Sequence, residues 1–106
     1  MGLRKIVAII KNEALEKVKA RLVELGVKGI SVTKVKGYGE YVNFFKSDCM
    51  VIHSRIEIFT EEARADLITT AIMEVAHTGI EGDGIVAVIP VLKLYRIRTK
   101  TEVLPD

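Results

Sequence analysis

The order of hydrophobic patterns along this chain restricts its fold more than any other feature, because one order occurs in both halves. In the first half, the short β-branched run Leu3–Ile10 predicts a buried strand. Apolar residues then recur at intervals of three and four over residues 13–25, which predicts an amphipathic helix. We expect Asn12 to cap this helix and Gly26 to end it. A second strand is expected from Ile30 to the Gly37-Tyr38-Gly39 segment.

The second half of the chain repeats this order. Residues 50–59 alternate between apolar and polar side chains, which predicts a third strand. Thr60 is in position to cap a second helix that runs to about His77 and is stopped by Gly79. The apolar stripe of this helix consists of Leu67, Ile68, Ala71, Ile72 and Val75.

The chain closes with two further strand signals. The continuous apolar run Ile85–Ile89 predicts a central strand that Pro90 breaks, and residues 94–99 predict a short final strand. The complete order predicts an α+β fold, a ferredoxin-like βαββαβ antiparallel sheet with two helices on one face. Since Ile85–Ile89 is apolar at consecutive positions, the second face also needs cover, and we expect another copy of the chain to supply it.

Length and composition indicate one domain, residues 1–106, with enough apolar content for a core, because 49% of the residues are hydrophobic. Sixteen basic and fourteen acidic residues nearly balance, which argues against nucleic acid or an anionic membrane as the main partner. The single cysteine, Cys49, excludes an internal disulfide. The N-terminal apolar run is too short for a signal peptide or a membrane span, so we expect a cytoplasmic protein.

One glycine-rich segment and one arginine pair suggest a site for phosphate groups. Thr78, Gly79, Gly82, Asp83 and Gly84 form a loop in which glycine lets backbone amides approach an anion closely. If residues 94–99 form a strand, Arg96 and Arg98 share one face and Ile97 points into the core. The alternative is that the glycines only shape a tight turn and that the arginines are solvated.

These segments, taken with the rest of the chain, resemble the PII signal-transduction proteins. The resemblance runs nearly end to end and implies a homotrimer of ferredoxin-like subunits that binds ATP or ADP between neighbouring subunits. Residues 78–85 resemble the B-loop of that family, residues 96–102 its C-terminal loop, and residues 39–49 a shortened T-loop. The other matching segments are Ile6–Ile10, Leu25–Thr33, Val35–Gly39 and Arg55–Ile58.

The resemblance also implies roles for single residues. Ser31, Gly37 and Glu57 would lie near the adenosine, and the B-loop residues with Arg96 and Arg98 would hold the phosphates. The full nucleotide-binding set is Ser31, Gly37, Glu57, Thr78, Gly79, Gly82, Asp83, Gly84, Arg96 and Arg98.

Three departures from the family pattern bear on the effector. Ile85 stands where the family has a phosphate-binding lysine, and Glu40 and Tyr41 stand where it has an arginine and the glutamine that ligates Mg²⁺. His53 stands in place of the lysine that binds 2-oxoglutarate. We therefore expect ADP or AMP to bind at least as tightly as ATP, and 2-oxoglutarate to add nothing.

The shortened T-loop carries an aromatic tip. Tyr41, Phe44 and Phe45 could dock a protein partner, because exposed aromatic side chains often become buried at interfaces. The alternative is that the two phenylalanines fold back onto the sheet or the trimer.

Catalysis and metal binding are not expected. Cys49 and His53 share a strand face and, together with His77, suggest a metal site, but no second ligand cluster accompanies them. No catalytic grouping of side chains stands out. We therefore predict a non-enzymatic signalling protein that binds an adenine nucleotide effector and controls a transporter or metabolic enzyme through its T-loop. The alternative is a trimeric module that has lost nucleotide sensing and binds another small molecule or a metal.

Overall fold

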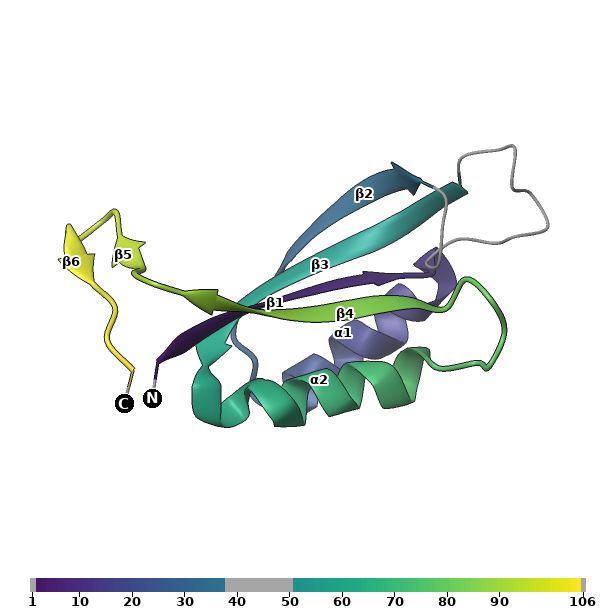
Figure 1. Ribbon diagram of the computed structural model, residues 1–106, viewed down its shortest axis with the longest axis horizontal. Coiled ribbons are helices and arrows are strands. Elements are labelled where there is room, and N and C mark those ends of the chain that lie inside the picture. The colour runs from purple at the N-terminus through teal and green to yellow at the C-terminus, as the bar shows by residue number, and fades with distance from the viewer. Residues whose placement is uncertain (1, 38–50, 106) are drawn as a thin grey trace.

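A computed structural model describes residues 2–37 and 51–105 of the chain (Figure 1). The first half contains strand β1 (Leu3–Ile10), a single 3₁₀ turn η1 (Asn12–Ala14), helix α1 (Leu15–Glu24) and strand β2 (Ser31–Gly37). The second half contains β3 (Val51–Glu61), α2 (Glu62–Ala76), β4 (Gly84–Val91) and two short strands, β5 (Tyr95–Arg96) and β6 (Thr101–Glu102). Within the described ranges, no helix is long and apolar enough to span a membrane.

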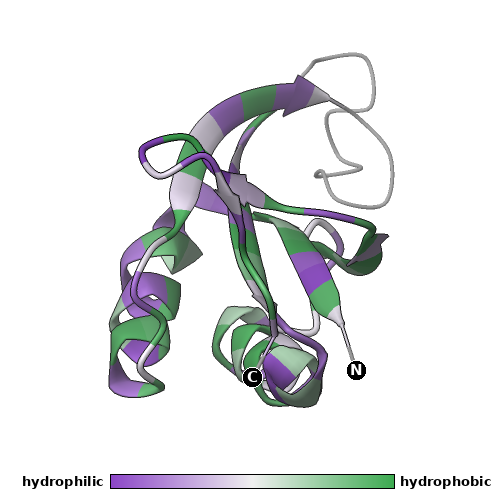
Figure 2. Cartoon of the chain, turned by 90° about the vertical axis from the view of Figure 1, so that its left-hand side faces the viewer, coloured by the Kyte–Doolittle hydropathy of each residue, from purple (hydrophilic) through white to green (hydrophobic). Residues whose placement is uncertain are grey.

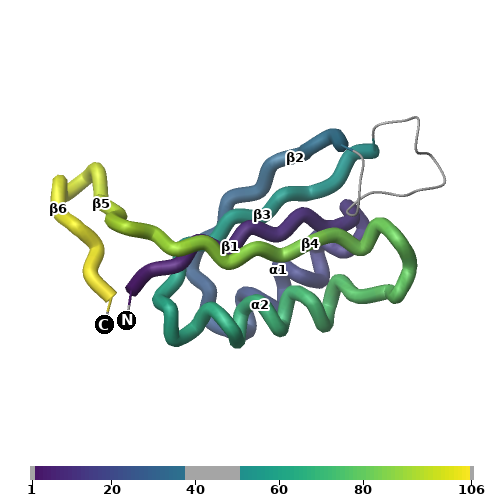
Figure 3. The backbone as a smooth tube through the Cα atoms, in the orientation of Figure 1, coloured from purple at the N-terminus to yellow at the C-terminus, as the bar shows by residue number. Residues whose placement is uncertain are grey.

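The main sheet has the strand order β2-β3-β1-β4, and every neighbouring pair is antiparallel. Both helices lie on the same side of this sheet (Figures 1 and 2). The predicted ferredoxin-like βαββαβ arrangement is therefore confirmed. Strands β5 and β6 pair only with each other and form a hairpin beyond the end of β4, at the opposite end of the molecule from the loop that joins α2 to β4 (Figure 3).

The hydrophobic core lies between the helices and the sheet. Along β1, the side chains of Ile6, Ala8 and Ile10 are buried at every second position, as expected for a strand with one face on a core. Full burial of an isoleucine side chain contributes roughly 1.5–3 kcal/mol to stability. The other members of the cluster are Val18, Leu22, Ile56, Ile58, Ala65, Ile68, Ile72 and Ala76.

The face of the sheet that points away from the helices is partly apolar and exposed in the single chain. Val7 and Ile9 alternate with the buried residues of β1 and lie opposite Ala87 and Ile85 of β4. The exposed fractions are 40% for Ile85 and 42% for Ile89. We call this surface the open face, and such a surface requires a partner to be buried.

Two predicted helix caps are wrong. Asn12 lies in the 3₁₀ turn and makes no cap bond, because its side-chain oxygen accepts hydrogen bonds from the Ser54 hydroxyl (2.6 Å) and from Lys34 (3.1 Å). Thr60 lies inside β3, which continues to Glu61. At the start of α2, the Glu62 amide instead donates a hydrogen bond to the carbonyl oxygen of Gly2 at 2.9 Å.

The predictions for the chain after residue 84 need three corrections. Strand β4 lies at an edge of the sheet and not at its centre, and an edge strand can contain Pro90 because one side of its backbone has no partner strand. The predicted strand over residues 94–99 is limited to Tyr95–Arg96 and is followed by a turn in which the Lys100 amide donates to the Arg96 carbonyl (2.8 Å). Ile97, expected in the core, is 93% exposed.

The predicted stripe of the second helix also needs a correction. Leu67 is 51% exposed, whereas Ala65 and Ala76 are buried together with Ile68 and Ile72. The buried face of α2 therefore includes the small side chains of Ala65 and Ala76.

We predict that Gly84→Ala destabilises the fold strongly. A Cβ at residue 84 would lie 1.9 Å from the carbonyl oxygen of Ile9, and the φ of +118° is unfavourable for any residue with a side chain. We expect a loss of about 2–3 kcal/mol in the free energy of unfolding, measured by urea titration. Gly29→Ala is the control, because no atom lies within 4 Å of its Cβ position. An unchanged stability of Gly84→Ala would contradict the prediction.

Candidate functional site

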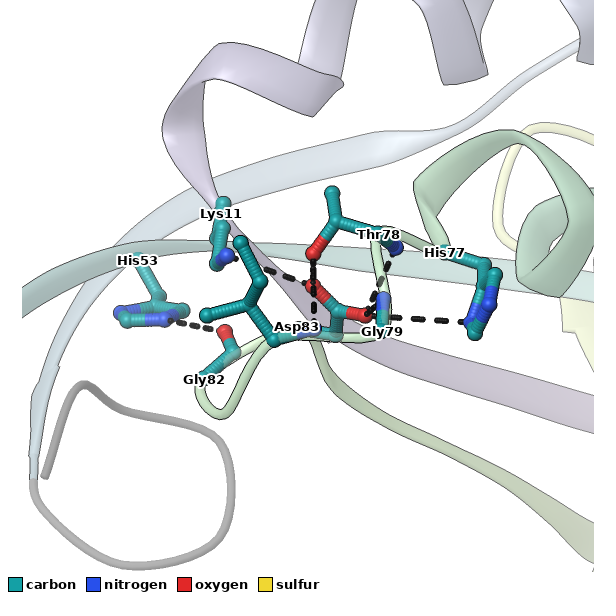
Figure 4. Close-up of polar contacts among 8 residues, drawn as sticks. Lys11, His53, His77, Thr78, Gly79, Gly82 and Asp83 are labelled. Atoms are coloured by element: carbon teal, nitrogen blue, oxygen red, sulfur yellow. Dashed lines mark hydrogen bonds and ion pairs between the residues drawn. The ribbon is translucent and has the colours of Figure 1, made fainter.

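The loop between α2 and β4 is organised around the carboxylate of Asp83 (Figure 4). One carboxylate oxygen accepts hydrogen bonds from the backbone amides of Thr78 (2.8 Å) and Gly79 (2.9 Å). The other oxygen accepts a hydrogen bond from the Thr78 hydroxyl and lies 3.2 Å from the ammonium group of Lys11. The carboxylate thus ties the first residues of the loop to its last residue and to the end of β1.

These contacts keep Asp83 ionised. Burial of the carboxyl group acts to raise its pKa, but the hydrogen bonds from Thr78, Gly79 and Lys11 together outweigh burial and lower the pKa well below the ordinary value for aspartate. The negative charge is therefore a permanent part of the loop at neutral pH.

The glycines of the loop adopt backbone conformations that other residues rarely adopt. Gly79, Gly82 and Gly84 have φ values of +85°, +96° and +118°. The loop therefore needs glycine at these positions, as a backbone that curves around an anion does. The amides of Thr78 and Gly79, however, already donate to Asp83.

Sequence reasoning missed two residues that support this loop. Lys11 follows directly after Ile10, which pairs with Gly84, so the strand register brings Lys11 beside Asp83. His53 of β3 is only 3% exposed, and its Nε2 atom lies 3.2 Å from the carbonyl oxygen of Gly82. The pairing of β1 with β4 could have indicated Lys11, whereas no sequence pattern indicates the contact of His53.

Ser31 and Glu57 lie opposite each other on β2 and β3, on the open face. The Glu57 carboxylate pairs with Lys5 at 2.5 Å and with Arg55 at 3.5 Å. The hydrogen bond from Lys5 is the main cause of a lowered pKa of Glu57, and partial burial opposes it. Gly37 is buried at the end of β2, beside Val51 of β3.

Arg96 and Arg98 lie far from the glycine loop of the same chain. The loop precedes Gly84 at one end of β4, and the arginines follow Val91 at the other end, so the strand alone separates them by roughly 23 Å (Figure 3). Arg98 lies in the exposed turn after β5. Arg96 instead lines a cleft of about 480 Å³ whose other walls include Gly26, Gly29, Phe59, Thr60, Arg64 and Leu104.

Several predicted positions fall outside the described residues. These are the partner-docking residues Tyr41, Phe44 and Phe45, together with Glu40 and Cys49. Of the two histidines, His53 contacts Gly82, and His77 Nδ1 lies 3.9 Å from the Asp83 carboxylate. Residues 2–37 and 51–105 contain no group of three or more histidine, cysteine or acidic side chains that could hold a metal ion.

The fold and the loop together define a protein with a ferredoxin-like sheet and a glycine-rich turn at one end of an edge strand. The family model described as nitrogen regulatory protein P-II matches residues 3–101. The chain belongs to this family of regulatory proteins, as the resemblance in its sequence predicted.

Individual relatives agree with this assignment. The P-II protein of Azospirillum brasilense is 38% identical over 104 residues, which cover 92% of this chain and 93% of the relative. The P-II protein of Rhodospirillum rubrum is 36% identical with the same coverage. A crystal structure of Arabidopsis thaliana PII bound to citrate has a TM-score of 0.83 and 29% identity, and the match covers 96% of this chain and 89% of that one.

We predict that Asp83→Asn lowers the free energy of unfolding by about 1.5–3 kcal/mol at neutral pH, the scale of hydrogen bonds to a charged group. Because the pKa of Asp83 is lowered in the folded state, its stabilising effect is present above the ordinary aspartate pKa of about 3.9 and is lost as the pH falls below that value. The difference in the free energy of unfolding between wild type and Asp83→Asn should therefore become smaller at acidic pH.

Urea titrations at neutral pH and below the ordinary aspartate pKa measure this difference, with Asp66→Asn on the exposed side of α2 as the control. A difference between wild type and Asp83→Asn that stays constant across these pH values would contradict the role of the carboxylate.

Proposed function

We propose that this protein is a signalling regulator that binds an adenine nucleotide, either ADP, AMP or ATP, between the subunits of a homotrimer. The observation that carries the proposal is the separation of the glycine loop from Arg96 and Arg98 along β4. The loop offers backbone amides but few cations, and the arginines offer cations without a loop. A second subunit is needed for both groups to contact one nucleotide.

The surfaces of the single chain support this assembly. The open face presents Val7, Ile9, Ile85 and Ile89 without a covering element, and a subunit interface would bury them. The β5–β6 hairpin projects beyond the main sheet (Figure 1), and it carries exposed apolar side chains at Ile97 and in the flanking segments. The most exposed of these residues are Leu92, Ile97 and Leu104, at 98%, 93% and 71%. A hairpin of this kind is suited to pack against a neighbouring subunit and to carry its arginines there.

The choice of nucleotide follows from the charges around the loop. Ile85, the residue after Gly84, offers no cation for a further phosphate group, and Lys11 is already paired with Asp83. A triphosphate carries more negative charge than a diphosphate, so it gains little from this loop. We propose that ADP or AMP binds at least as tightly as ATP and that 2-oxoglutarate does not strengthen binding.

In this proposal the nucleotide controls a protein target, such as a transporter or a metabolic enzyme, through residues 39–49. Val51, the first described residue after that segment, begins β3, which also carries His53 and its contact with the glycine loop. Tyr41, Phe44 and Phe45 are the proposed docking residues, because aromatic side chains supply most of the binding energy at many interfaces.

We predict a trimer in solution by multi-angle light scattering. Ile89→Asp on the open face should shift the protein to smaller species, because a carboxylate is costly to bury in an apolar interface. Val23→Asp is the matched control, since Val23 is 72% exposed on α1 and lies away from the open face. A monomer mass for the wild type would exclude the proposed assembly.

We predict that Arg96→Ala and Arg98→Ala each weaken ADP binding by about 1.5–3 kcal/mol, the scale of a hydrogen bond to a charged group. Isothermal titration calorimetry with ADP, AMP and ATP measures the loss and the order of affinities. Lys93→Ala removes a nearby exposed cation and should have little effect. Unchanged affinity in both arginine variants would remove the phosphate role of this segment.

Mixed trimers test whether the site is shared between subunits. Arg96→Ala and Gly82→Ala chains, unfolded and refolded together, should regain ADP binding, because a mixed trimer contains an interface with an intact loop on one side and an intact arginine on the other. Each variant alone should remain weak. No recovery in the mixture would contradict a site shared between subunits.

A further inference from the structure

His53 makes a buried contact with the glycine loop from a different part of the sheet. It lies on β3, is 3% exposed, and approaches the carbonyl oxygen of Gly82 at 3.2 Å through Nε2 (Figure 4). Gly82 has a φ of +96°, a backbone conformation that residues with a side chain rarely adopt. The contact with the imidazole restrains the orientation of the Gly82–Asp83 peptide group.

The direction of the hydrogen bond is determined by the chemistry of the two groups. A carbonyl oxygen has no proton to donate, so the Nε2 atom of His53 must carry the proton and donate it. The peptide bond between Gly82 and Asp83 is planar and trans. In such a group the N–H points opposite to the C=O, and the amide of Asp83 therefore points away from His53.

Two other amides of the loop are held by the Asp83 carboxylate. The amides of Thr78 and Gly79 point inward to the Asp83 carboxylate and cannot bind a ligand at the same time. The amide of Asp83 is directed by its peptide plane, which His53 orients. One loop thus contains inward amides fixed by a carboxylate and an amide whose direction is set by an imidazole.

We propose that His53 is a positioning residue for phosphate binding: it orients the Gly82–Asp83 peptide so that the Asp83 amide donates to a phosphate oxygen of the bound nucleotide. This inference rests on the proposed function and adds the group that contacts the phosphate. Its role is indirect, because His53 acts through the peptide and not on the ligand.

Two substitutions separate orientation from packing. His53→Phe keeps an aromatic ring and removes the donor, whereas the Nε2 amide of Gln in His53→Gln can donate from a similar position. We expect His53→Phe to weaken ADP binding about tenfold or more, the scale of a lost bond to a charged group, and to leave adenosine binding unchanged. His53→Gln should recover most of the ADP affinity.

Calorimetry with ADP and adenosine decides between outcomes. Unchanged ADP affinity in His53→Phe would overturn the inference and leave the proposed function intact. An equal loss for ADP and adenosine would also overturn it, because a general structural effect does not distinguish a ligand with phosphates from one without them. If His53→Gln bound ADP no more tightly than His53→Phe, the hydrogen-bond donor of His53 would not be the cause of the effect, and the inference would be wrong.

Pyrophosphate provides a probe that does not depend on the adenine group. In ¹H–¹⁵N spectra, pyrophosphate should shift the Asp83 amide resonance of the wild type to lower field, and this shift should be absent in His53→Phe. If the wild type shows this shift but does not bind ADP, the nucleotide function fails and the positioning role stands. If the Asp83 amide does not respond to pyrophosphate or to ADP, the positioning role is wrong.

Discussion

The antiparallel pairing of β1 with β4 is the constraint on which the rest of the site depends. Gly84 lies opposite Ile10 and Val91 opposite Leu3, so the two strands are paired along their whole length. This close pairing requires a residue without a side chain at position 84, where a Cβ would meet the carbonyl oxygen of Ile9. The same pairing places the glycine loop at one end of β4 and the arginine segment at the other. A site that uses both the glycine loop and the arginine segment therefore cannot form within one chain and requires two chains.

The glycine loop divides its backbone amides between two tasks. The carboxylate of Asp83 accepts two of them, which closes the loop and satisfies groups that would otherwise need water. An amide that already donates to a carboxylate cannot also bind phosphate, so a loop rich in glycine offers fewer binding groups than its sequence indicates. The value of Gly82 lies in the peptide orientation it permits, because its carbonyl turns toward His53.

The sequence predicted the order of helices and strands, the antiparallel sheet with both helices on one face and most of the core, because periodicity reports which side chains face inward. It failed where a tertiary contact replaces a local one. Asn12 was predicted as a cap from its residue type, but Ser54 and Lys34 compete for the same oxygen. Pro90 was expected to end a central strand. It lies inside β4 because β4 is at an edge of the sheet. The contact between His53 and Gly82 joins residues 29 positions apart, which no local pattern encodes.

The charge arrangement bears on the proposal that a loop containing an aspartate binds a phosphate group. An exposed carboxylate beside a phosphate would repel it, but Asp83 directs its oxygens to Thr78, Gly79 and Lys11. The ammonium group of Lys11, 3.2 Å away, compensates the charge of the carboxylate. Glu81 is the exposed carboxylate of the loop, and in the inference above the phosphate is bound by the Asp83 amide, which is oriented through His53. In the proposed trimer, the neutralising cations for the nucleotide come from Arg96 and Arg98 of the neighbouring subunit. Nucleotide affinity and subunit assembly are then coupled, because the loop alone supplies geometry and the neighbour supplies charge.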